Sequence, residues 1–258
     1  MYVLEVQTVQ ASAFRILIEA LKEILTDANL EFDETGMKIM AMDSSHTVLV
    51  HLKLNANNFE LYKCKSTTLI GVNMINLFKL IKTMGNSDIL TLYLEEDNQS
   101  VLGIHIENSE KNSITKYKLN LMDLYQDNIQ IPPPTFSSVI TMPSVDFQKI
   151  CRDMHNLSED LEIKSLGNQL IFSCNGDFAS QETLIGETNS GMSYIQNESP
   201  DEIVQGVFNL KYLVLFGKCT NLCNSIELYL KNDYPLIIKY SVASLGEIKL
   251  CLAPKCSD

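Results

Sequence analysis

The 258-residue sequence lacks the features that define several large classes of protein. It has no apolar run close to the roughly 18 to 20 residues that a membrane-spanning helix needs, and its start does not resemble a signal peptide. It also contains no G-x-x-x-x-G-K-[ST], G-x-S-x-G or H-E-x-x-H motif, which mark nucleotide-binding, ester-cleaving and zinc-peptidase sites. We therefore expect a soluble intracellular protein that binds no membrane and is not an enzyme.

The segment Asp43–His46 places an aspartate, two serines and a histidine together, which are the residue types of a catalytic triad. Three such residues crowded into four positions seldom converge on one substrate atom. The segment also leads directly into an alternating strand, Val48–Leu54. We interpret it as a turn and not as an active site.

The seven cysteines are odd in number, form no C-x-x-C pair and do not stand at zinc-finger spacing with any histidine. Cys219 and Cys223 lie one helical turn apart, but no second pair accompanies them. We expect free structural thiols in a reducing compartment, with no metal and no cofactor.

An internal repeat is the strongest feature of the chain. Segments 12–39 and 144–170 share a pattern of helix, turn, strand and hairpin, and segments 77–94 and 213–230 echo one another in the same way. The offset of about 131 to 136 residues is much longer than the period of a solenoid, so the repeat indicates duplicated domains. In the first pair Phe147 corresponds to Phe14, Leu161 to Leu30, Ile163 to Phe32, Gly167 to Gly36 and Leu170 to Ile39.

Each half contains period-two strands separated by turn residues, with two helices of about 10 to 14 residues. Strands and helices do not alternate regularly along the chain, as they would in a parallel sheet. The predicted fold class is α+β with antiparallel sheets, in two tandem similar domains of residues 1–121 and 136–258.

Between these domains, residues 122–135 form a predicted connecting loop that contains three consecutive prolines, which hold a chain extended. Ile129 and Ile131 are apolar residues in this otherwise exposed tether. They either dock the loop onto its own sheet or form an edge for a partner, and the composition does not decide between these alternatives.

Positive charge is concentrated on the four predicted helices, 12–25, 74–83, 146–155 and 210–218. They carry eight basic and four acidic residues, whereas the whole chain has a formal net charge of −12. The basic residues of each helix are three or seven positions apart and therefore share one face. One such helix would be an ordinary solvated surface, but four in an acidic chain favour a phosphate-binding face. The basic residues are Arg15, Lys22, Lys79, Lys82, Lys149, Arg152, Lys211 and Lys218.

The charges do not alternate with aromatic residues, as a stacking platform for single strands would require. Contact with the backbone of duplex nucleic acid is the better interpretation, even though a negative net charge by itself argues against nucleic acid.

Five segments together resemble the signature segments of the eukaryotic proliferating cell nuclear antigen (PCNA) family of DNA sliding clamps, in order and over the whole chain. They are MDSSH (42–46), GVN (71–73), LMDL (121–124), ICRD (150–153) and LAPK (252–255). The resemblance implies a homotrimeric ring in which twelve helices line the hole and the sheets form the outside. The eight basic residues fall on positions that line the hole in such clamps, with Asn156 where a histidine is usual. The ring would bind double-stranded DNA without sequence preference.

The resemblance also implies a pocket beside the connecting loop for short peptides that carry an apolar residue and two aromatic residues on one helical turn. Cys251 stands in place of a usual tyrosine, Thr47 in place of a valine and Cys256 in place of an isoleucine. These departures predict a smaller, softer pocket rim. Carried over, the pocket residues are Met42, His46, Leu49, Ile129, Ile131, Pro132, Pro235, Ala253 and Pro254.

Subunit contact in the family comes from edge strands, expected here around Thr115–Leu121 and Thr183–Thr188. We expect Tyr117, Leu119, Leu184 and Ile185 at that contact. The implied partners are a DNA polymerase, a clamp loader and other replication and DNA repair proteins, in the nucleus or in a viral replication compartment. Two alternatives stay open, a subunit of a heterotrimeric clamp and a divergent viral monomeric processivity factor.

Overall fold

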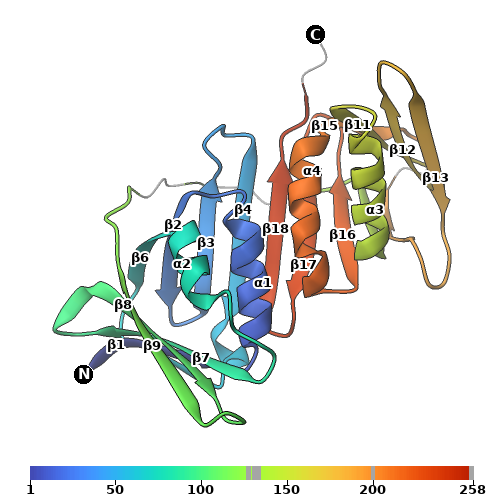
Figure 1. The fold of residues 1–258 in the computed structure, drawn as a ribbon. Coiled ribbons are helices and arrows are strands. Elements are labelled where there is room, and N and C mark those ends of the chain that lie inside the picture. The colour runs from blue at the N-terminus through green and yellow to red at the C-terminus, as the bar shows by residue number, and fades with distance from the viewer. Residues whose placement is uncertain (126–128, 130–134, 199–200, 256–258) are drawn as a thin grey trace. The chain divides into compact units, whose positions relative to one another are not determined.

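The computed structural model describes residues 1–125, 129, 135–198 and 201–255, and the chain divides into two compact units (Figure 1). The first unit comprises Met1–Ser44, Val50–Ile129 and Ser241–Ile248, and the second comprises Ser45–Leu49, Gln130–Tyr240 and Lys249–Asp258.

The first unit contains two α-helices, a short 3₁₀ turn and antiparallel strands. Strands β5-β1-β7-β8-β9 form one sheet in that order, and β4, β3, β2 and β6 lie side by side in a second set. The elements are β1 (Tyr2–Thr8), α1 (Ala11–Leu21), β2 (Asp27–Asp33), β3 (Gly36–Met42), β4 (Val48–Asn55), η1 (Ala56–Asn58), β5 (Leu61–Cys64), β6 (Thr68–Asn73), α2 (Met74–Ile81), β7 (Asp88–Glu95), β8 (Asn98–Asn108) and β9 (Ser113–Asn120).

The second unit repeats this plan, although parts of β17 and β18, within Ser241–Ile248, are counted with the first unit. Strands β14-β10-β16-β17-β18 are neighbours in that order, and β13-β12-β11-β15 form a four-stranded sheet. The elements are β10 (Ser138–Pro143), α3 (Ser144–His155), β11 (Asp160–Leu166), β12 (Gln169–Asn175), β13 (Ser180–Gly186), β14 (Ser193–Asn197), β15 (Val204–Asn209), α4 (Leu210–Phe216), η2 (Gly217–Leu222), β16 (Ser225–Leu230), β17 (Leu236–Val242) and β18 (Gly246–Leu252).

The two strand orders are the same once nine is added to each strand number of the first unit. The duplication predicted from the sequence is therefore confirmed, together with the α+β class and the antiparallel sheets. Phe14 on α1 and Phe147 on α3 occupy equivalent places in the two cores, and both side chains are fully buried. Truncating either residue to alanine is expected to cost about 3 to 5 kcal/mol of stability.

The helices form because apolar residues recur at helical spacing and polar residues cap the ends. On α1 the buried positions include Phe14, Leu17 and Leu21, which share one face. The second helix of each unit starts in the same way, because Asn73 accepts a hydrogen bond from the Asn76 amide (3.0 Å) and Asn209 accepts one from the Lys211 amide (2.9 Å). In each unit the two helices lie next to one another (Figure 1).

The equivalent hairpins β2–β3 and β11–β12 both turn at glycine. Gly36 has a φ of +143° and Gly167 a φ of +59°, conformations that side chains disfavour. At Gly36 an added Cβ would also lie 1.9 Å from the carbonyl oxygen of Leu54, so the turn cannot accept another residue there without moving the chain.

Three predicted helix ends were wrong by a few residues. Helix α1 ends at Leu21 and not at residue 25, because the amides of Glu23 and Ile24 bond three residues back and tighten the turn. Helix α2 has 8 residues and α4 has 7, shorter than expected. Beyond α4 the chain continues as η2 from Gly217, where glycine, threonine and asparagine are weak helix formers.

Candidate functional site

The basic residues of the first unit differ in their availability to an outside anion. Arg15 pairs with Glu19 on the same helix (3.5 Å). Lys22, just after α1, pairs with Glu23 and lies over the ring of Phe78 on α2, 5.0 Å from its centroid. The remaining two cations, on α2 and at its C-terminal cap, are exposed and have no ion pair among the described residues: Lys79 and Lys82.

The same distinction holds in the second unit. Lys149 pairs with Asp153 one turn along α3 (3.1 Å). Arg152 is exposed in the last turn of α3, where the helix dipole favours a cation. Lys211 and Lys218 are exposed on α4 and η2. Of the eight predicted residues, five therefore have no ion pair in the described chain. The charges of the other three are partly neutralised by acidic residues. Those acidic residues can be found in the sequence, because they are adjacent to the basic residue or four positions from it.

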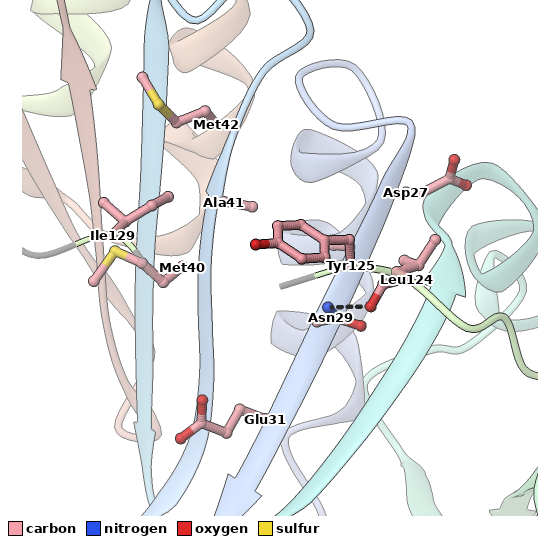
Figure 2. A pocket seen from close by; sticks show the side chains of 10 residues that line it. Asp27, Asn29, Glu31, Met40, Ala41, Met42, Leu124, Tyr125 and Ile129 are labelled. Atoms are coloured by element: carbon pink, nitrogen blue, oxygen red, sulfur yellow. Dashed lines mark hydrogen bonds between the residues drawn. The ribbon is translucent and has the colours of Figure 1, made fainter. Parts of the chain in front are cut away.

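A cavity of about 230 Å³ brings together two predicted peptide-site residues of the first unit, Met42 and Ile129. Figure 2 shows Met40 and Ile129 on one side, and Asn29 and Leu124 on the other, with Tyr125 between them. The Asn29 side chain donates a hydrogen bond to the Leu124 carbonyl (3.4 Å), which ties the start of the connecting loop to β2.

This cavity has a polar side as well as an apolar one. Asp27, Asn29 and Glu31, at alternate positions of β2, form a polar wall that the sequence analysis did not name. Their period-two spacing was a signal that would have found them. Tyr125 is 91% exposed, so its ring is open to solvent. Ile131 and Pro132 lie outside the described residues.

The second unit contains the other described peptide-site residues, and a backbone hydrogen bond links two of its segments. The Ala253 amide donates to the Thr47 carbonyl (3.0 Å), which fixes the C-terminal segment beside the turn that carries His46. Leu49, Pro235, Ala253 and Pro254 are all partly exposed.

Pro254 lines a separate cavity of about 640 Å³ with Tyr234 and Lys255. Lys255 holds the C-terminal segment in place with two hydrogen bonds. Its amide donates to the Val207 carbonyl (2.8 Å), and its Nζ donates to the Asp160 carboxylate (2.7 Å).

Cys251 is 8% exposed, and burial raises the pKa of its thiol to about 11. The Cys251 side chain therefore packs below the protein surface. The expectation that it forms part of the pocket rim was wrong. Thr47 is partly exposed as expected, and Cys256 lies outside the described residues.

The strands predicted to meet a neighbouring subunit are both at the edge of a sheet. Strand β9 ends one sheet of the first unit, and β13 ends the four-stranded sheet of the second. On β9, Tyr117 and Leu119 are partly exposed. On β13, Leu184 is 54% exposed and Ile185 is partly exposed. Among the described strands, neither β9 nor β13 has a second neighbour, so the free edge of each can pair with another strand.

Across the described residues, no group of three or more histidine, cysteine, aspartate and glutamate side chains is arranged to hold a metal ion. Cys151 and Cys219 are fully buried, and burial raises the pKa of both thiols, that of Cys219 to about 12. In the part of the chain that the structure describes, no helix has the length and apolar character needed to cross a membrane.

Comparison with known proteins gives matches over nearly the whole chain. Residues 3–129 match the model of the proliferating cell nuclear antigen N-terminal domain, and residues 130–255 match that of the C-terminal domain. The chain is 40% identical over 254 residues to a protein of Paramecium bursaria Chlorella virus 1 named probable DNA polymerase sliding clamp 1, covering 96% of this chain and 95% of the relative. It is 35% identical over 261 residues to the proliferating cell nuclear antigen of Chaetomium thermophilum, covering 99% of each. The chain therefore belongs to the proliferating cell nuclear antigen family.

Proposed function

We propose that this protein is a DNA sliding clamp that encircles duplex DNA and holds replication proteins on it. The observation that carries the proposal is the position of the positive charge: five cations that have no ion pair among the described residues lie on or directly after helices, in a chain with a net charge of −12. Cations on regular helices suit contact with phosphates of any sequence, while the acidic remainder repels DNA from other surfaces. The viral relative is named a probable DNA polymerase sliding clamp, which supports the same function.

The proposed assembly is a homotrimeric ring, closed by pairing of β9 from one subunit with β13 from the next. Such an assembly is head-to-tail, and it removes the two exposed edges that a lone subunit would present. Tyr117, Leu119, Leu184 and Ile185 are the proposed contact residues. A heterotrimeric clamp and a monomeric processivity factor are the alternatives, and they differ from the homotrimer in native mass.

The described residues that we propose for partner docking are Met42 and Ile129 in the first unit, and His46, Leu49, Pro235, Ala253 and Pro254 in the second. The proposed partners are peptides that present one apolar and two aromatic side chains on a helical turn, carried by a DNA polymerase, a clamp loader and repair proteins. The polar wall of the β2 cavity, Asp27, Asn29 and Glu31, would place carboxylate and amide groups beside such a peptide.

In this account the protein acts by binding alone and carries out no reaction itself. We expect the protein to act where DNA is copied, in the nucleus or in a viral replication compartment.

The first experiment is the native molar mass by light scattering across a concentration series. A mass of three times the subunit mass of 29.1 kDa is expected for the homotrimer. A stable mass of 29.1 kDa would contradict self-assembly and would favour the monomeric or heterotrimeric alternative.

A further inference from the structure

We propose that Tyr212, on α4, is a positioning residue for the peptide site: its hydroxyl fixes the turn Ser45–Thr47, and so presents His46 to the bound peptide. This inference rests on the proposed function and adds a residue that does not itself touch the peptide. All the residues involved belong to the second unit.

The turn needs an external anchor because its backbone is strained. His46 has a φ of 55°, in the left-handed region that residues with a side chain seldom occupy. His46 is also exposed, so packing around its own side chain does not hold this conformation. A strained residue of this kind persists when its neighbours are fixed on both sides.

The neighbours are fixed by a chain of hydroxyl groups. Ser45 Oγ donates a hydrogen bond to Thr47 Oγ1 (3.0 Å), and Ser45 Oγ lies 2.9 Å from the Tyr212 hydroxyl. The Ser45 and Tyr212 hydroxyl groups share one hydrogen bond, in which either oxygen can be the donor. On the far side of His46, the Thr47 carbonyl accepts the Ala253 amide (3.0 Å). Tyr212 thus holds the start of the turn, and the C-terminal segment holds its end.

Tyr212 is a rigid anchor because α4 is itself well fixed. Leu210, Leu213 and Phe216 of this helix are buried, and Asn209 caps its first turn. Lys211 Nζ lies 5.7 Å from the centroid of the Tyr212 ring. Replacing the tyrosine with phenylalanine keeps the ring and this cation contact, and removes only the hydroxyl.

The consequence for binding is preorganisation. A peptide that contacts His46 and Ala253 meets a turn already in its final shape, and does not bear the cost of ordering it. Without the Tyr212 hydroxyl the turn samples other conformations. The apparent affinity for the peptide is then the intrinsic affinity multiplied by the fraction of molecules whose turn has the binding conformation. One neutral hydrogen bond corresponds to a loss of about two- to tenfold in affinity.

The test compares Tyr212→Phe, Ser45→Ala and the double variant in the full-length protein. A fluorescently labelled peptide with one apolar and two aromatic residues on one helical turn is titrated by anisotropy, and amide hydrogen exchange is followed at Ser45–Val48. The matched control is Tyr194→Phe, which removes a hydroxyl bonded to Ser165 (2.9 Å) and to the Gln169 carbonyl (3.0 Å) elsewhere in the same unit.

We expect Tyr212→Phe to weaken peptide binding about two- to tenfold and to speed exchange in the turn, while the melting temperature and duplex binding stay unchanged. The double variant should bind no more weakly than Ser45→Ala, because both changes remove the same hydrogen bond. Wild-type affinity and exchange in Tyr212→Phe, or an equal loss in Tyr194→Phe, would overturn the inference and leave the proposed function standing. A wild-type protein that binds no peptide would instead overturn the peptide-docking function and this inference with it.

Discussion

Replacing Lys79 and Lys82 with alanine is expected to flatten the salt dependence of duplex binding. Both side chains are exposed and have no ion pair in the described chain, and the hydrogen bond from Lys79 to Asn76 is long at 3.5 Å. A lysine that neutralises one phosphate adds about 0.9 to the slope of log K against log salt. Losing both should lower that slope by about 1.8 for each subunit in contact with DNA.

The assay is equilibrium anisotropy with a short labelled duplex over a series of salt concentrations. The control variant replaces Lys63 and Lys65, which pair with Glu5 and Glu96 at 3.3 Å each and lie on or next to β5. It removes the same two charges from the same unit but away from the helices. Its slope should equal that of the wild type.

The outcome that refutes this reasoning is an equal fall in slope for both double variants. Net charge would then explain the binding, and the helices would have no special part in it. An unchanged slope for both variants would show that phosphates contact neither set of lysines.

Three further predictions concern other parts of the molecule. Asp33→Asn should cost about 1 to 2 kcal/mol of stability at neutral pH, because hydrogen bonds from Lys38 and Thr35 hold the pKa of Asp33 well below its usual value. Since the folded pKa is the lower one, this difference should shrink as the pH falls below about 4 in denaturant titrations, and a pH-independent difference would contradict it. Cys219 and Cys251 should resist alkylation in the folded protein at mildly alkaline pH, because burial raises their pKa to about 12 and about 11; mass spectrometry that finds them modified before unfolding would refute this. Ile129→Ser should weaken capture of the aromatic-bearing peptide with little change in melting temperature, whereas a matching loss of thermal stability would show that Ile129 mainly docks the connecting loop.

The sequence predicted the duplicated fold well because local patterns encode it. Strand β1 follows from the alternation at the start of the chain, and α1 from apolar residues at positions such as Phe14 and Leu21. The glycines at 36 and 167 mark the same hairpin in both halves, since each turn has a backbone that favours glycine. These signals lie within a few residues of one another, where periodicity is informative.

The finer features of the site were not predictable, because they depend on contacts between distant residues. The Ser45–Tyr212 hydrogen bond joins residues 167 positions apart, and no local sequence pattern predicts it. The burial of Cys251 was also missed. Alignment with the tyrosine that is usual in the family identifies the position of Cys251 in the chain, but it does not show how deeply the smaller cysteine side chain is buried.

The most direct test of the proposed clamp is whether the protein is held on DNA topologically. The protein is allowed to thread onto a linear duplex that is blocked at one end, the open end is then capped, and the complex is washed at high salt, which removes phosphate contacts. We predict that the protein stays on the capped DNA and leaves once a restriction enzyme cuts beside the cap. Release from capped and cut DNA at the same rate would contradict encirclement, and with it the central claim that this protein is a sliding clamp.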